Sequence, residues 1–208
     1  MSAASAPIKV GAVLFDGFEL LDVFGPLEMF GMLKEKATIT MLAAQPGSIR
    51  SSQGPACVAD AALAGDFGLD VLLVPGGMGT RGLVSDQPFL DELRRQSDAA
   101  RFVATVCTGS GLLARTGALD GRSATSNKFA FKWAASQGPS VTWVATARWV
   151  EDGKFFTSSG VSAGMDMALA LIARIFDRET SVRAANWAEY AWHEDRDWDP
   201  FAKLNGLG

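Results

Sequence analysis

The chain is poor in the residues that build metal sites and disulfide frameworks. Its 208 residues contain two cysteines and one histidine. Cys57 and Cys107 lie far apart in dissimilar contexts, which argues against a disulfide framework and leaves room for a reactive thiol. No histidines or cysteines are paired at ligand spacing, so we expect no metal and no other cofactor.

Long apolar runs and an excess of basic charge are also missing. The N-terminal stretch MSAASAPIKVGAVLFDG has no basic region before its apolar run, and Asp16 and Gly17 end that run. We therefore expect neither a signal peptide nor a membrane anchor, and a cytoplasmic protein. The 19 Lys+Arg against 23 Asp+Glu give a net charge of -4. The basic residues are scattered, which disfavours nucleic acid and anionic membranes and leaves a small molecule as the expected partner.

The apolar sequence that is present suffices for one core, and we expect one domain over residues 1–208. Short apolar runs, each followed by Gly, Pro or polar residues, predict buried parallel strands. These runs cover residues 8–15, 37–44, 71–75 and 102–107. Helical patterns lie between them, at 19–33, 88–98 and 109–117. This alternation predicts a three-layer α/β/α sandwich with a flavodoxin-like, mostly parallel sheet.

The second half of the chain predicts two further helices and a hairpin. Asp152-Gly153 lies between strand-like flanks in residues 147–159, which is typical of a two-residue hairpin turn. A second hairpin is expected within 48–60. Residues 161–176 predict a long helix that covers one sheet face. A helix over 178–192 would carry Trp187, Tyr190 and Trp192, for which core packing is expected and a dimer face is the alternative.

Cys107 is the most informative candidate. It ends an apolar strand and is followed by Thr108-Gly109-Ser110-Gly111 and a helical pattern. This order predicts a cysteine nucleophile elbow that holds the sulfur at the mouth of the sheet. We expect the helix N-terminus to stabilise the thiolate and lower its pKa. The alternative is a small buried hydrophobe that ends a core strand. For Cys57 we expect a half-buried hairpin cysteine without a functional role.

Asp22 and a glycine pair follow two other strands. Asp22 lies between Leu20-Leu21 and Val23-Phe24. It is either an acid of raised pKa suited to general acid or base catalysis, or part of a solvated helix face. Gly76 and Gly77 after VLLVP let bare backbone amides approach a ligand, as oxyanion-hole donors do, although a plain turn is the default.

Other polar and aromatic residues are weaker candidates. We expect four of them, Arg81, Ser85, Asn127 and Phe129, to line the mouth of the pocket that the elbow would face. His193, in the polar segment YAWHEDRDWDPF, is expected to be solvated, and a role as a base stays open.

Four blocks of the sequence resemble the ThiJ/PfpI superfamily of class I glutamine-amidotransferase-like proteins. They are GAVLFDGFELLDVFGPLEMF, DVLLVPGG, TVCTGSGLLARTGALDGRSATSN and FFTSSGVSAGMDMALALI. The resemblance runs from Ile8 to Phe176 with the blocks in the expected order. It implies that the elbow cysteine is reactive, that an acid on the first helix hydrogen-bonds it, and that the protein is a homodimer.

Within the superfamily, LLDVFGPLE together with CTGS is similar to the isonitrile hydratases, which add water to an isocyanide to give an N-substituted formamide. This resemblance implies that Cys107 attacks the isonitrile carbon and that Asp22 protonates the adduct and activates water. Thr108 would contribute beside the sulfur, and the Gly77 backbone, next to Gly76, would face the developing charge. A thiolate with one carboxylic acid suits this addition in its own right.

Departures from related patterns exclude some activities and leave others open. Thr108 stands where protease-like members carry His, which disfavours a Cys-His triad. Asn127 stands where the similar sensor domains of AraC-type regulators often have His, and we expect no appended helix-turn-helix domain. A cofactor-free glyoxalase or other small-carbonyl hydrolase would use the same Cys107 and acid, although such members more often have Glu at the position of Asp22. A redox sensor that oxidises Cys107 to a sulfinate is the non-enzymatic alternative.

Overall fold

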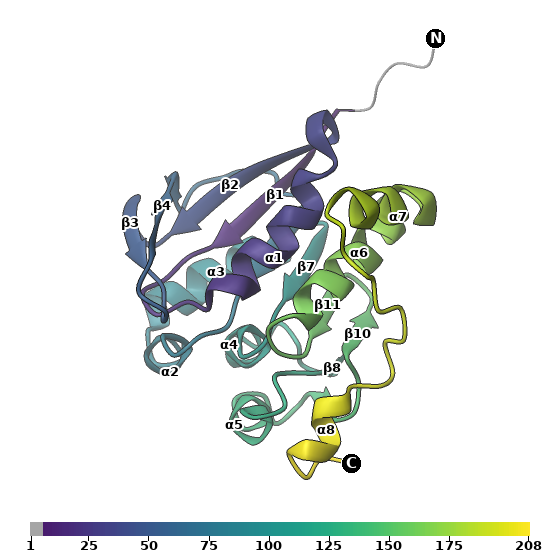
Figure 1. Ribbon diagram of the computed structural model, residues 1–208. Helices are drawn as coiled ribbons and strands as arrows, with labels where there is room; N and C mark the ends of the chain where they lie inside the picture. Colours follow the sequence, from purple (N-terminus) through teal and green to yellow (C-terminus); the bar gives the residue numbers. More distant parts are fainter. Residues whose placement is uncertain (1–5) are drawn as a thin grey trace.

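The computed structural model describes residues 6–208. Residues 1–5, part of the stretch in which we expect no leader, lie outside the described residues. The central sheet has the strand order β10-β11-β7-β6-β1-β2-β5 (Figure 1). Its strands are β1 (Ile8–Val13), β2 (Ala37–Ala43), β5 (Ala61–Ala62), β6 (Val71–Val74), β7 (Phe102–Thr105), β10 (Trp149–Asp152) and β11 (Phe155–Ser158). All neighbours are parallel except β10 and β11, which confirms the predicted mostly parallel sheet.

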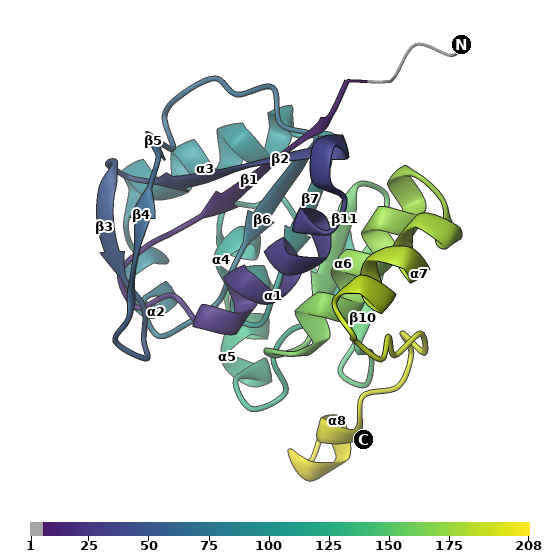
Figure 2. The ribbon, with the colours of Figure 1, turned by 45° about the horizontal axis from the view of Figure 1, so that its top comes forward.

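Helices cover both faces of the sheet, as predicted (Figures 1 and 2). One face carries α1 (Leu20–Gly31), α6 (Ala163–Ile175) and α7 (Arg178–Trp187). The other carries α3 (Gln87–Ala99) and α4 (Gly109–Arg115), with the short helices α2 (Thr80–Leu83) and α5 (Phe131–Ser136) beside α4. The other two helices of the described residues are the 3₁₀ helix η1 (Lys34–Lys36) and α8 (Pro200–Leu204). No helix within residues 6–208 is long and apolar enough to cross a bilayer.

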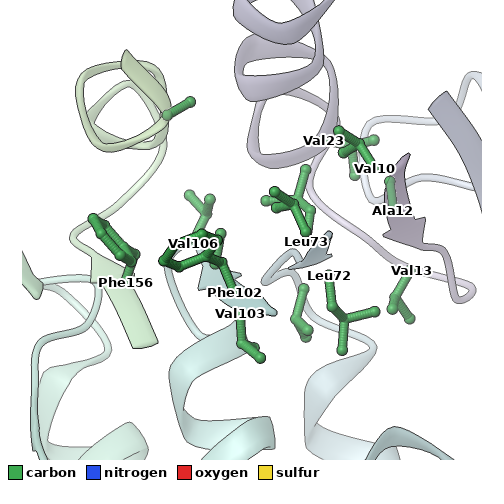
Figure 3. Close-up of a cluster of buried hydrophobic side chains, with 14 of the residues drawn as sticks. Val10, Ala12, Val13, Val23, Leu72, Leu73, Phe102, Val103, Val106 and Phe156 are labelled. Carbon is green, nitrogen blue, oxygen red and sulfur yellow. The ribbon is translucent and has the colours of Figure 1, made fainter. Parts of the chain in front are cut away.

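The central strands are apolar throughout because helices bury both of their faces. Figure 3 shows Val10 and Leu73 on the side of α1, and Leu72 and Val103 on the opposite side. These four side chains are at most 1 % exposed. Successive side chains point to opposite faces, and both faces are buried. The strands are therefore continuous apolar runs in the sequence and do not alternate between apolar and polar residues.

The strand order places a crevice between β1 and β6. The chain passes from β1 through α1 to β2 on one side of β1, and β6, β7 and β11 then follow on its other side. Open α/β sheets bind ligands at such a switch point, outside the carboxyl ends of the strands. Here the loops after β1 and β6 are joined by hydrogen bonds from Glu19 N to Gly76 O (2.9 Å) and from Gly79 N to Gly17 O (3.1 Å).

Both predicted hairpins are present. β10 pairs with β11 around Gly153 and Lys154, one residue later than the predicted Asp152-Gly153 turn. Gly153 has φ 63°, which suits the first position of a tight hairpin turn. The second hairpin pairs β3 (Gly47–Arg50) with β4 (Ala56–Ala59). A further small sheet, which the sequence did not predict, pairs β8 (Ser123–Ala124) with β9 (Thr142–Trp143).

The helix predicted over 178–192 is too long. α7 ends at Trp187, and Glu189 adopts φ 49°. The Tyr190 amide then donates to Ala185 O at 2.9 Å, so the chain reverses in the manner of a Schellman cap. Tyr190 and Trp192 therefore do not share a helix with Trp187, which is 56 % exposed rather than in the core.

Residues 188–199 form a segment, here named the C-terminal strap, that leads from α7 to α8. It passes the edge strand β10, where the Arg148 amide donates to Arg196 O at 2.7 Å. At its end the Asp199 amide donates to Thr146 O at 2.9 Å. The strap thereby fixes the start of α8 at the carboxyl end of the sheet (Figure 1).

Candidate active site

Cys107 occupies a tight turn between β7 and α4. Its φ of 56° lies in the left-handed region, which costs a non-glycine residue about 1–2 kcal/mol. The surrounding hydrogen bonds hold this conformation. The Cys107 amide donates to Ser159 O (3.2 Å), and its carbonyl accepts from Ser110 Oγ (3.0 Å) and Ser126 Oγ (2.9 Å). Strain maintained in this way is typical of functional sites.

Asp22 is a buried acid of the first helix and not part of a solvated face. Its side chain is 0 % exposed, and its Oδ2 accepts from the Gly76 amide at 2.9 Å. Within the described residues, Oδ1 is buried without a hydrogen-bond partner. Burial raises the pKa of Asp22 well above its usual value, and the nearby charge of Glu19 raises it further. The protonated carboxyl is thus the favoured form, next to Cys107.

Burial also raises the pKa of the Cys107 thiol, and the charge of Asp22 adds to the rise. The hydrogen bond from the Thr108 amide acts in the opposite direction. The predicted low pKa is therefore wrong in direction. Desolvation of the buried sulfur outweighs what one short helix can supply, so burial favours the neutral form of the thiol as it does that of the acid.

The amides of Gly76 and Gly77 are not free, in contrast to the prediction for an oxyanion hole. Gly76 N donates to Asp22, and Gly77 N donates to Thr108 Oγ1 at 3.1 Å. A Cβ at position 76 would lie 2.6 Å from Thr108 N, so only glycine permits this approach. The glycine pair orients Asp22 and Thr108 instead of presenting bare donors.

A chain of polar contacts extends from Thr108 toward solvent. Thr80 Oγ1 lies 3.2 Å from Thr108 Oγ1 and accepts from Arg81 Nη1 at 2.8 Å. The Arg81 guanidinium stacks on Trp133, 3.4 Å from the ring centroid. Partial burial lowers the pKa of Arg81, and the charge of Cys107 opposes that change. A cation therefore lies within electrostatic range of the sulfur.

A cavity of about 320 Å³ is lined in part by Ser159, whose carbonyl accepts from the Cys107 amide. Asn127 and Phe129 line it, as predicted for the mouth of the pocket. Ser85 is exposed after α2 and is not among its lining residues. Phe201 and Asn205 of the C-terminal segment also line the cavity. No sequence pattern pointed to Phe201 or Asn205, because only the strap brings them near the site.

The remaining candidates lie elsewhere. Cys57 is partly exposed on β4. His193 is partly buried in the strap rather than fully solvated, because its amide donates to Asp166 Oδ1 at 2.9 Å. Among the described residues, no group of three or more His, Cys, Asp or Glu side chains is placed to hold a metal ion.

Comparisons with known proteins show which proteins this chain resembles. An isonitrile hydratase of Pseudomonas putida is 32% identical over 186 residues, which are 88% of this chain and 79% of that protein. The transcriptional regulator GbdR of Pseudomonas aeruginosa is 32% identical over 84% of this chain, but only 48% of its own length is covered. A crystal structure of a ThiJ/PfpI family protein from Pseudomonas syringae superposes with a TM-score of 0.82 at 31% identity, covering 93% of this chain and 77% of that one.

The model of the DJ-1/PfpI family matches residues 8–174, which include β1, α1 and the turn at Cys107. The same family thus contains both an enzyme and a regulator that are similar to this chain. On this match, and on the fold and the relatives that agree with it, the chain belongs to the DJ-1/PfpI family.

Proposed function

We propose that this protein hydrates isonitriles to N-substituted formamides through a thioimidate on Cys107. The observation that carries the proposal is the buried acid. Asp22 is 0 % exposed, its Oδ2 is held by Gly76, and its Oδ1 has no partner within the described residues. A protonated carboxyl in this position can donate a proton to a neutral substrate beside the sulfur. The similarity to the Pseudomonas putida isonitrile hydratase supports the same chemistry.

The first step adds the thiol across the terminal carbon of the isonitrile. Asp22 gives its proton to that carbon, Sγ of Cys107 bonds to the same carbon, and the thiol proton passes to the carboxyl. The product is a thioimidate, R–N=CH–S–Cys107, and Asp22 is again neutral. Because proton transfer accompanies attack, this step does not need a thiolate of low pKa in the resting enzyme.

The second step hydrolyses the thioimidate. Water adds to its carbon while Asp22 takes a proton from the water and gives one to the nitrogen. The tetrahedral intermediate then expels the sulfur, which regains its proton, and the N-substituted formamide leaves. Thr108, held by the Gly77 amide, would keep the thioimidate beside Asp22. The sum of both steps is addition of one water to one isonitrile.

The test is turnover of cyclohexyl isonitrile by the purified protein, with formamide followed by NMR. We expect many equivalents of product per chain from the wild type and from Cys57→Ser, since Cys57 has no role in the proposal. Cys107→Ala is expected to give no product above the uncatalysed rate.

Lack of turnover with cyclohexyl, benzyl and methyl isonitriles would reject the hydratase proposal. Methylglyoxal would then be tested as a substrate of the same thiol and acid. A sensor would behave differently from either enzyme, because Cys107 would be oxidised once per chain and no product would accumulate.

A further inference from the structure

The cavity beside Cys107 is in contact with the site through three of its lining residues. Leu21 directly precedes Asp22 in α1. Ser159 provides the carbonyl that accepts from the Cys107 amide. Asn127 follows Ser126, whose hydroxyl donates to the Cys107 carbonyl. Cys107 and Asp22 are not themselves lining residues, but the residues that hold the Cys107 backbone and precede Asp22 form part of the cavity wall, which places the cavity next to the site.

The lining of the cavity suits a neutral, apolar group. Leu21, Val161 and Phe201 contribute apolar side chains, and Asn127 contributes an amide. Lys128 is the charged residue of the lining, but it is only 4% exposed, and its Nζ donates to Thr125 Oγ1 and to the Ala147 carbonyl. Its ammonium is therefore already paired with protein atoms and is not presented to a ligand.

The size of the cavity allows a ring. A cavity of roughly 150 Å³ is enough to hold benzene in a protein interior. The cavity beside Cys107 measures about 320 Å³ and opens to solvent near Phe129, which is 91% exposed. A cyclohexyl or phenyl substituent fits this space.

One wall of the cavity comes from α8, which lies outside the residues 8–174 matched by the family model. Asp199 fixes this helix, because its side chain accepts from the Phe201 amide at 2.9 Å and is itself only 3% exposed. The strap is held further back by Asp166, whose Oδ1 accepts from Tyr190 Oη (3.0 Å). Specific hydrogen bonds of the strap and of Asp199 therefore determine the position of Phe201.

We propose that α8 forms the specificity wall of the site, and that Phe201, together with Leu21 and Val161 of the same lining, binds an apolar, ring-sized substituent on the isonitrile nitrogen. This inference rests on the proposed function for the identity of the substrate. The pocket itself can be tested without that function. Its occupant is defined by chemistry, as a neutral cyclic hydrocarbon group attached through nitrogen to the carbon that Cys107 attacks.

The experiment uses isothiocyanates, R–N=C=S, in which the electrophilic carbon is also bonded to N–R. The Cys107 thiol adds to that carbon to give a dithiocarbamate, and the thiol proton moves to nitrogen. The rate of adduct formation with cyclohexyl and methyl isothiocyanate is measured by intact-protein mass spectrometry in the Cys57→Ser protein. The same protein with Cys107→Ala gives the background from amines.

We expect the cyclohexyl reagent to react faster at Cys107 than the methyl reagent. Phe201→Ala is expected to reduce this preference about tenfold, while the methyl rate changes less than about twofold, because only the larger group reaches the wall. Leu204→Ala is the matched control, since Leu204 is 78% exposed on the same helix and is not part of the lining. It should leave the preference unchanged.

Val161→Phe tests a second lining residue by filling the cavity, and it should slow the cyclohexyl reagent selectively. Equal preference in the wild type and in Phe201→Ala would overturn the proposal, as would absence of any preference in the wild type. If the preference falls in Phe201→Ala but no isonitrile is hydrated, the pocket is correct and the proposed function is wrong. If isonitriles are hydrated with a preference that Phe201→Ala does not change, the function holds and the specificity wall is wrong.

Discussion

At the scale of residues, the site is a pair of buried groups whose neutral forms are favoured by desolvation, and the charge of Asp22 also opposes ionisation of the Cys107 thiol. Asp22 and Cys107 both have raised pKa values because burial penalises their charged forms, and the charge of Asp22 raises the pKa of the thiol further. The charge of Asp22 therefore affects the pH at which the Cys107 thiol ionises. This coupling can be measured as a change in the pKa of Cys107.

Asp22→Asn should lower the pKa of Cys107, because the substitution removes the negative charge that opposes thiolate formation. The rate of iodoacetamide alkylation at Cys107 is measured against pH in the Cys57→Ser protein. We expect the wild-type midpoint to lie above the ordinary thiol value of about 8.5 and the Asp22→Asn midpoint to lie below that of the wild type. A midpoint that does not move would show that the two groups are not coupled.

The same substitution should change how stability depends on pH. The folded-state pKa of Asp22 is raised, so its protonated form stabilises the fold below the unfolded-state pKa, and that contribution is lost as pH rises through the folded-state pKa. Asp22→Asn cannot ionise and avoids this loss. Urea titrations should show the variant gaining stability relative to the wild type as the pH rises above the ordinary carboxyl pKa of about 4. Glu28→Gln, on the exposed side of α1, is the control for replacing a carboxylate by an amide on this helix.

Thr108→Val should destabilise the fold and slow turnover. Thr108 Oγ1 accepts from the Gly77 amide, so valine leaves this amide without a partner, while Thr80 Oγ1 keeps its hydrogen bonds to Gly77 O and Arg81. The expected loss is about 1–3 kcal/mol in the free energy of unfolding. Thr108→Ser keeps the hydroxyl and should retain most of the stability. Equal stability of the valine and serine variants would contradict this role.

The sequence allowed Cys107 and Asp22 to be selected, because one ends an apolar strand and the other interrupts an apolar stretch of helix. It did not allow their ionisation to be predicted. The pKa of a buried thiol depends on desolvation and on a carboxyl 85 positions away in the chain, and neither is encoded in the local pattern. For the same reason the sequence could not show that Asp22 and Thr108 already occupy the Gly76 and Gly77 amides.

At the scale of elements, the C-terminal strap depends on one buried ion pair. Asp166 of α6 accepts from Arg148 Nε at 2.7 Å and also from Tyr190 and the His193 amide of the strap. Neither charge of the pair is more than 9 % exposed. The carboxylate thus joins α6, the start of β10 and the strap, so its removal should destabilise the packing of all three.

Asp166→Ala should lower the free energy of unfolding by about 3–5 kcal/mol, because Arg148 would remain buried without its partner. Asp98→Ala is the control, since the Arg94–Asp98 pair is a solvent-exposed pair on α3 and should be worth at most about 1 kcal/mol. Urea denaturation of both variants gives the comparison. A similar small loss in the two variants would mean that the buried pair does not hold the strap.

Elements with a regular pattern were predictable, and those defined by a terminus or a distant contact were not. The strands and the helix over residues 161–176 were predicted to within a few residues because their apolar spacing is dense. α7 ended early because Glu189 adopts a left-handed conformation that normally favours glycine, and the sequence carries no glycine there. α8 has five residues and depends on Asp199 and on the strap, so its own composition could not place it.

At the scale of the whole molecule, the sheet topology brings together loops that are distant in the sequence. The carboxyl ends of β1, β6 and β7 deliver Asp22, Gly76 and Cys107 to the same crevice. This convergence follows from the alternation of strands and helices and was predictable. The position of α8 beside the site was not predictable, because the strap that leads to this helix runs past the edge of the sheet (Figures 1 and 2).

The measurement that tests the central claim most directly is a rapid acid quench of the protein with cyclohexyl isonitrile, followed by peptide mapping. The account predicts an adduct of one isonitrile mass on the peptide that contains Cys107, formed before the first formamide and absent from Cys107→Ala. Formamide produced at the wild-type rate by Cys107→Ala, or an adduct confined to another residue, would contradict it.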